Sequence, residues 1–256
     1  LDGLGPMTAR EKLPTLRTAQ LLLPWDIQVA RAESRAQASL GLDSLDEAIR
    51  QAHRLLRIAP YRMPTYKWIG TLYKAQGRPD LALATYEQGL RHVPNEASLL
   101  YALAEAQQEL GLRRETMETY RRLVEVEASP VGQVRALSEH IEWRFAKAHL
   151  ALSSLSARRD NPDAPFQHRR AAACLLAQRR LLFHGNPASY LAIEELDADL
   201  ERSLRADEEK LWQRLAVDFE ERGDTRAAEL AREQSAKVDE TREHLEQIIK
   251  EVHESR

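Results

Sequence analysis

Apolar residues recur every three or four positions over most of the chain, which is the spacing of amphipathic helices. The clearest stretch is residues 66–94, YKWIGTLYKAQGRPDLALATYEQGLRHVP. Two segments with this period are separated by Gly77-Arg78-Pro79, and Pro94 closes the second. Glycine permits the left-handed backbone that ends a helix, and proline cannot continue one. The pattern therefore predicts two antiparallel helices joined by a short turn.

This pattern is repeated along the chain. The first predicted helix carries bulky, small and aromatic residues, and the second carries a small and an aromatic residue: Tyr66, Ile69, Gly70 and Tyr73, then Ala82 and Tyr86. A forward shift of 34 residues places on them Leu100, Leu103, Ala104, Gln107, Thr116 and Tyr120. A backward shift of 34 places Ala36, Ala48 and Pro60 on Gly70, Ala82 and Pro94. Three copies of one unit are therefore expected.

The residue types of this unit suit a stacked array of helices. Small residues let two helices approach closely, and the bulky residues fill the space beside that contact. One hairpin cannot bury its own apolar face, so the copies are expected to stack. The pattern resembles the tetratricopeptide repeat (TPR), which implies an all-α protein: a right-handed α-solenoid of antiparallel helix hairpins, forming a TPR-like superhelix with a long C-terminal helix.

The resemblance divides the chain into four parts. The repeat motif returns near the end as Trp212, Leu215, Ala216, Phe219 and Gly223. The predicted parts are an N-terminal segment with a capping helix (1–26), three repeats (27–130), elongated or degenerate hairpins (131–208) and a TPR-like hairpin with an extended final helix (209–256).

The final helix, expected from about residue 224 to 251, keeps one apolar stripe beyond the repeat. The stripe consists of Val238, Leu245, Ile248, Ile249 and Val252. Such a stripe needs a covering surface. Either the helix folds back as a C-terminal cap, or it pairs with another chain and makes the protein self-associate.

Charge is balanced overall but uneven along the chain. The net charge is −3, from 37 Lys and Arg against 40 Asp and Glu, so no overall field favours nucleic acid. Residues 158–180 hold six Arg and two Asp, whereas residues 194–209 hold eight carboxylates and two Arg. These segments are expected on adjacent helices that face each other or water.

No motif for catalysis, nucleotide binding or metal binding is present. The sequence has neither a GxGxxG nor a GxxxxGK[ST] loop, and its eight histidines include no HExxH spacing. We therefore expect no enzyme activity, no cofactor and no metal. The one cysteine, Cys174, stands in the apolar stretch AAACLLA and is expected to be buried.

The compartment is left open by the sequence. No apolar run reaches the roughly 18–20 residues that cross a bilayer, and no cleavable leader is recognisable. The sequence therefore predicts a soluble segment without membrane insertion, in either the cytoplasm or the periplasm. The chain begins at Leu1 and not at a methionine, which suggests a processed form or a piece of a longer protein.

In TPR arrays the first helices line a concave groove that holds a peptide or a partner helix, and the resemblance implies such a groove here. Helical spacing places in it Lys67, Thr71, Lys74, Tyr101, Glu105, Gln108, Arg135 and Glu139. Lysines beside a tyrosine favour an acidic or C-terminal segment with an apolar anchor. Chaperone-binding members use an asparagine where this chain has Trp68 and Ala102, which disfavours that specialised role.

Two functions fit the sequence. The favoured one is a protein–protein interaction scaffold. The alternative is a soluble, extracytoplasmic C-terminal TPR domain of a bacterial membrane glycopolymer enzyme, similar to O-antigen ligases and polymerases. An enzyme on a helical scaffold is the third option and lacks any supporting motif.

Overall fold

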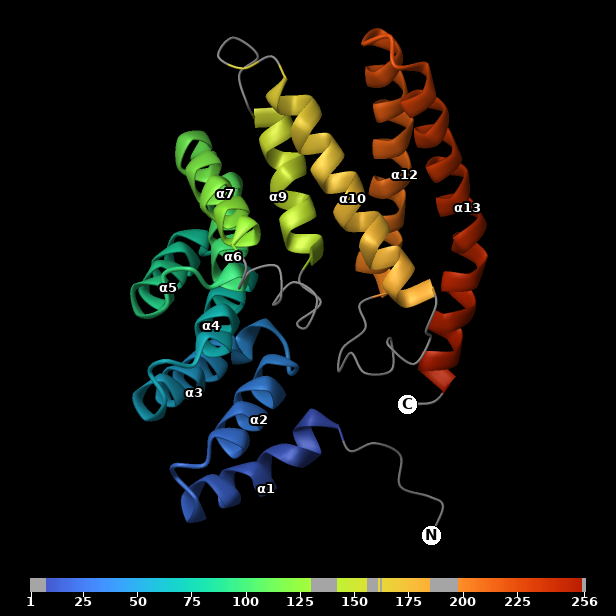
Figure 1. The fold of residues 1–256 in the computed structure, drawn as a ribbon. Helices are drawn as coiled ribbons and strands as arrows, with labels where there is room; N and C mark the ends of the chain where they lie inside the picture. The colour runs from blue at the N-terminus through green and yellow to red at the C-terminus, as the bar shows by residue number, and fades with distance from the viewer. Residues whose placement is uncertain (1–7, 130–141, 156–160, 162, 185–197, 255–256) are drawn as a thin grey trace. The chain divides into compact units, whose positions relative to one another are not determined.

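The computed structural model describes residues 8–129, 142–155, 161, 163–184 and 198–254. These residues form eleven α-helices and one short 3₁₀ turn, and no strand occurs among them, so the all-α prediction is confirmed (Figure 1). The chain divides into two compact units, Leu1–Thr119 and Tyr120–Arg256, which are described separately below.

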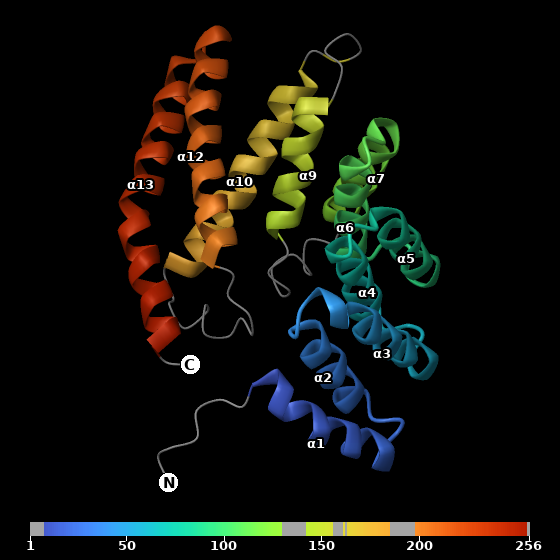
Figure 2. The same cartoon turned by 180° about the vertical axis from the view of Figure 1, so that it is seen from behind.

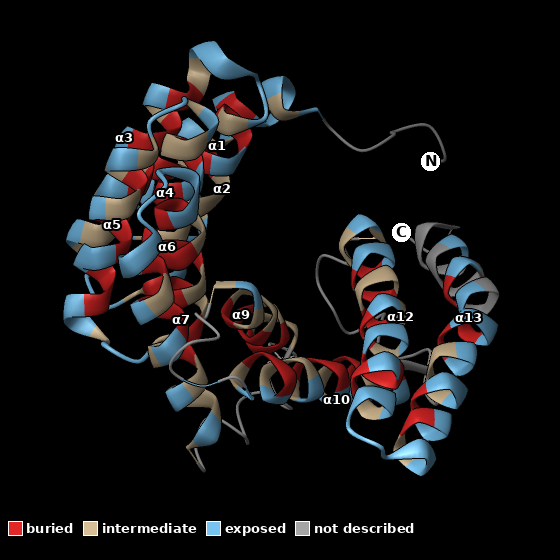
Figure 3. Ribbon diagram, turned by 90° about the horizontal axis from the view of Figure 1, so that it is seen from above, coloured by how far each residue is buried: buried red, intermediate tan, exposed pale blue. Residues whose placement is uncertain are grey.

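The first unit is a stack of consecutive helices. It contains α1 (Ala9–Leu22), α2 (Ile27–Ala38), η1 (Leu42–Ser44), α3 (Leu45–Ile58), α4 (Met63–Ala75), α5 (Pro79–His92) and α6 (Ala97–Glu109), and α7 (Arg113–Ala128) begins in it. Each helix from α1 to α6 packs on the next one, and α4 also contacts α6. Figure 3 shows the buried residues of these helices along the contacts between them. The predicted stack of helix hairpins is therefore present, and α1 packs on α2 at its N-terminal end.

The turns between paired helices repeat the same hydrogen bond. Gly77 and Gly111 have φ angles of 72°, and Gly223 in the second unit has 76°. The amide that follows each glycine donates to a carbonyl of the preceding helix at 2.9 Å, in the pairs Arg78–Tyr73, Leu112–Gln107 and Asp224–Phe219. This is the left-handed C-terminal cap that the glycines predicted.

Small residues lie where paired helices cross, as the sequence predicts. A Cβ atom at Gly70 would overlap the ring of Tyr86, which is 2% exposed. Ala82 and Ala104 are fully buried at 0% exposure. The close approach of α4 and α5 therefore depends on the missing side chain of Gly70.

The first copy departs from the predicted 34-residue register. The buried residues of α2 match those of α4 at a shift of 36: Ala30, Glu33, Ser34 and Ala36 stand for Tyr66, Ile69, Gly70 and Leu72. Assigning Ala36 to the crossing position was therefore wrong, because Ser34 lies there and its hydroxyl donates to the Ala48 carbonyl at 2.8 Å. The cause is a longer turn: residues 39–44, with η1, join α2 to α3, whereas residues 76–78 join α4 to α5.

The second unit contains longer helices. They are α9 (Glu142–Leu155), α10 (Ala164–His184), α12 (Ala198–Glu221) and α13 (Thr225–Glu254). α9 packs on α10, α10 on α12, and α12 on α13, around an apolar cluster that includes Phe166, Leu176 and Leu215. α12 is one continuous helix, so the boundary expected between residues 208 and 209 falls inside it.

The final helix runs alongside α12 (Figures 1 and 2). Two residues of its apolar stripe are buried, Val238 at 0% and Leu245 at 2% exposure. This burial supports the folded-back cap over pairing with another chain. The side chains of Ile248, Ile249 and Val252 lie outside the described residues, so self-association through them stays a prediction.

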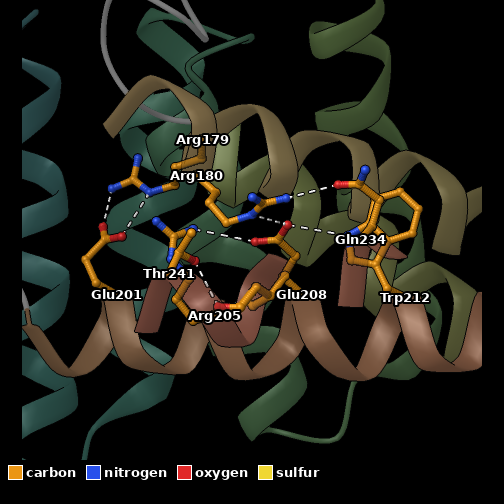
Figure 4. Close-up of polar contacts among 9 residues, drawn as sticks. Arg179, Arg180, Glu201, Arg205, Glu208, Trp212, Gln234 and Thr241 are labelled. Carbon is orange, nitrogen blue, oxygen red and sulfur yellow. Dashed lines mark hydrogen bonds and ion pairs between the residues drawn. The ribbon is translucent and has the colours of Figure 1, made fainter. Parts of the chain in front are cut away.

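The two charged segments face each other, which is one of the two arrangements that the sequence left open. Arg179 pairs with Glu201, and Arg180 Nε donates to Glu208 Oε1 at 2.9 Å, between α10 and α12 (Figure 4). All four residues are at most 4% exposed. The prediction that Cys174 is buried was wrong, because this residue of α10 is exposed.

Candidate interaction surface

Three of the predicted groove residues lie together on α4. Lys67 and Lys74 are half-buried and Thr71 is exposed. The opposite side of the helix forms the core, with Tyr66 at 1% and Ile69 at 0% exposure. The spacing of three and four residues therefore separates a core face from an outer face, as expected for an amphipathic helix.

A second set lies on α6, and an ion pair joins it to the first. Tyr101 and Glu105 are half-buried and Gln108 is exposed. Lys74 Nζ lies 2.6 Å from Glu109 Oε1, the residue that follows Gln108. Because α4 also packs on α6, the two sets form one continuous surface.

Thr71 also supports the core beneath this surface. Its hydroxyl donates to the Lys67 carbonyl at 3.0 Å and shares a hydrogen bond with the hydroxyl of Tyr86. Burial raises the pKa of Tyr86 to about 12, so this phenol stays neutral at physiological pH. Thr71 therefore links the outer surface of α4 to the Gly70–Tyr86 crossing.

Two further residues of this surface do not follow from the 34-residue period. With the register of 36 residues, Arg31 and Arg35 of α2 stand where α4 has Lys67 and Thr71. Arg31 is half-buried and Arg35 is exposed. The signal that could have revealed them is the segment LGLDS at residues 40–44, which lengthens the first turn. We call the surface formed by Arg31, Arg35, Lys67, Thr71, Lys74, Tyr101, Glu105 and Gln108 the α2–α4–α6 face.

A hollow of about 520 Å³ adjoins this face between α1 and α2. It is mainly apolar, and Lys12 and Arg35 provide its cationic groups. Its lining residues are Ala9, Lys12, Thr15, Leu16, Ala32, Arg35, Ala36 and Ser39. No carboxylate is among them, so an apolar side chain beside an acidic group would suit it.

The positions of the chaperone-type asparagine are occupied by structural residues. Trp68 Nε1 donates to Ser34 Oγ at 2.9 Å, and Ala102 is buried at 6% exposure. Neither side chain is available to hold a terminal carboxylate. The two remaining predicted groove residues, Arg135 and Glu139, lie outside the described residues, and their placement stays a prediction.

In the part of the chain that the structure describes, no group of three or more His, Cys, Asp or Glu side chains is arranged to hold a metal ion. Of the helices described, none has the length and apolarity to cross a membrane.

Stacked antiparallel hairpins with left-handed glycine caps place the chain among the helical-repeat solenoids. Residues 63–106 match the family model of the tetratricopeptide repeat, so this part of the chain carries TPR sequence. No curated protein sequence matches the chain.

Two solved structures illustrate this likeness. The crystal structure of BtubC (BKLC) from P. vanneervenii is 17% identical, with a TM-score of 0.55, covering 91% of this chain and 89% of that one. The MamA RS-1 ArsTM double mutant is 18% identical, with a TM-score of 0.50, covering 67% and 86%. At these identities the likeness concerns the fold.

Proposed function

We propose that the chain is a protein–protein interaction scaffold that binds a peptide or partner helix on the α2–α4–α6 face. The observation that carries this proposal is the equivalent placement of outer residues on α2, α4 and α6, of which α4 and α6 are joined by the Lys74–Glu109 ion pair. Aromatic residues with surrounding polar groups are common in protein-binding surfaces. The scaffold requires no catalytic group.

The charges on this face suggest the chemistry of the partner. Arg31, Arg35, Lys67 and Lys74 belong to α2 and α4, whereas the carboxylates Glu105 and Glu109 belong to α6. An acidic segment would lie across α2 and α4, and an apolar anchor would pack near Tyr101. Complementary charge of this kind raises the association rate and selects the partner.

Affinity capture from a lysate of the native host, followed by mass spectrometry, tests the proposal. The variant Arg31→Glu/Lys67→Glu should lose the partners that the unmodified protein captures. The control Arg78→Glu/Arg114→Glu changes the same charge at two exposed residues, one directly before α5 and the other at the start of α7. An identical set of partners with the first variant would refute the α2–α4–α6 face.

The glycopolymer-enzyme alternative stays a prediction, because the matching family model and the similar solved structures concern only the repeat and its fold. The sequence encoded upstream of Leu1 in the native gene would test it. A series of apolar helices there would support the alternative.

A further inference from the structure

Three helices of the second unit meet at a pair of histidines. His149 of α9 and His168 of α10 face each other with their Nδ1 atoms 2.8 Å apart. His149 Nε2 lies 3.0 Å from Glu127 Oε2 of α7. His149 is only 6% exposed and His168 is half-buried, so water does not separate these groups.

The geometry requires a hydrogen atom between the two rings. Two unprotonated nitrogens would bring their lone pairs together at 2.8 Å, and two protonated ones would bring their N–H groups together. The ring centroids are 5.1 Å apart, the separation expected when two imidazoles meet head-on, nitrogen to nitrogen. Lone pairs in this arrangement point at each other and do not converge on a common metal position.

Glu127 fixes the position of one proton of the pair, and the contact between the two Nδ1 atoms limits how many protons the pair can hold. The carboxylate of Glu127 accepts the Nε2 proton of His149, and one further proton lies between the two Nδ1 atoms. The neutral pair and the singly charged pair both satisfy these contacts. A doubly charged pair does not, because both Nδ1 atoms would then carry hydrogen.

We propose that Glu127, His149 and His168 form a pH-sensitive latch that holds α7, α9 and α10 together and opens when both imidazoles are protonated. The latch is closed at neutral pH. Opening it removes the bond between α9 and α10 at this point and brings two cations into a poorly hydrated site.

The charges of His149 and Arg121 oppose protonation of His168, whereas the carboxylate of Glu127 lies against His149 and not against His168. Burial, then the charge of His149 and that of Arg121, lower the pKa of His168 below its ordinary value of 6.5. A lowered folded-state pKa means that the stabilisation is complete above pH 6.5 and is lost as the pH falls through the folded-state value.

An NMR titration of the unmodified protein, with ¹⁵N-labelled imidazole rings, tests the latch directly. At pH 7.5 one hydrogen shared between the Nδ1 atoms of His149 and His168 is expected, and the proton on His168 that makes both rings cationic should bind only below pH 6.5. Hydrogen exchange of α9 and α10 should accelerate over that same pH interval. Independent titration of both rings near pH 6.5, with no shared hydrogen, would overturn the proposal.

His168→Asn supplies the second test. Its amide can donate to His149 Nδ1 but does not titrate in this range. Between pH 7.5 and 5.0 the unmodified protein should lose more stability than this variant, by about tenfold in the unfolding equilibrium constant for each unit of pKa displacement. His92→Asn, at an exposed histidine of the first unit, is the matched control and should follow the unmodified protein. Equal pH dependence in all three proteins would also refute the latch.

Discussion

At the scale of single residues, the crossing of α4 and α5 depends on one absent side chain. Gly70 lies directly beneath the ring of Tyr86, and the hydroxyl of that ring reaches Thr71 on the outer surface. In the next repeat the equivalent residue is Ala104, which is fully buried. The repeat therefore tolerates a methyl group at this position only where the facing residues leave room for it.

The variant Gly70→Ala should destabilise the protein by about 1–3 kcal/mol, because the added methyl group overlaps the buried Tyr86 ring and forces it to move. Chemical denaturation followed by circular dichroism measures this loss. In the double variant Gly70→Ala/Tyr86→Leu the penalty for the methyl group should shrink, since the ring is gone. A Gly70→Ala protein as stable as the original would contradict the packing described here.

Several residue-level features could be predicted from the sequence, and others could not. The turn glycines, the small residues of α4 and α6, and the outer positions of α4 follow from local spacing. The pairing of Lys74 with Glu109 and the role of Thr71 under Tyr86 depend on contacts between helices, which spacing does not reveal. The prediction that Cys174 is buried failed because an apolar run surrounds the whole helix, and only one side of the helix packs against the core.

At the scale of elements, a buried triad of charges joins α10, α12 and α13. Glu208 is 0% exposed and accepts from Arg180 Nε at 2.9 Å, while Arg205 Nη1 lies 3.5 Å from its other oxygen. Arg180 also donates to Gln234 of α13 at 3.1 Å (Figure 4). The composition of the two charged segments left open whether they would face each other or water. The burial of these charged side chains could not be predicted from composition, because it results from the packing of α10 on α12.

Removing one member of this triad should cost far more than removing all three. Glu208→Ala is expected to destabilise the protein by about 3–5 kcal/mol, because Arg180 and Arg205 lose their buried counter-charge. The triple variant Arg180→Met/Arg205→Met/Glu208→Leu should recover most of this loss. Thermal and denaturant unfolding of both variants provide the measurement.

The exposed pair of Arg202 and Glu246 is the control for the triad, because water screens it. Arg202→Ala should leave stability almost unchanged. If Glu208→Ala proved as mild as Arg202→Ala, the burial of the triad would be contradicted.

At the scale of the whole molecule, most of the fold could be predicted because each repeat contacts its neighbours through one recurring pattern. The solenoid class, the C-terminal cap glycines and the long α13 all follow from that pattern. The first repeat could not be placed correctly, because its longer turn shifts α2 by two positions relative to the 34-residue period. With the 34-residue register, Arg31 and Arg35 do not align with Lys67 and Thr71. The assignment of residues to the candidate site therefore depends on the correct register of α2.

Because the helices contact mainly adjacent helices, a substitution that destabilises one unit should leave the other unit folded. Glu208→Ala should accelerate hydrogen–deuterium exchange in α10, α12 and α13 and leave the amides of α4 and α5 as protected as before. Mass spectrometry of peptides from the exchanged protein resolves these regions. Equal loss of protection across both units would show that the chain unfolds as one cooperative body.

The exposed thiol on α10 allows the protein to be labelled at a single site. Cys174 is the single cysteine of the 256 residues and is exposed, so a maleimide fluorophore or a nitroxide spin label attaches at one position without any engineered substitution. Trp212 of α12 and Gln234 of α13 line the same hollow as Cys174. A label there would report through tryptophan quenching whenever α10 separates from the final hairpin, in the native sequence and in real time.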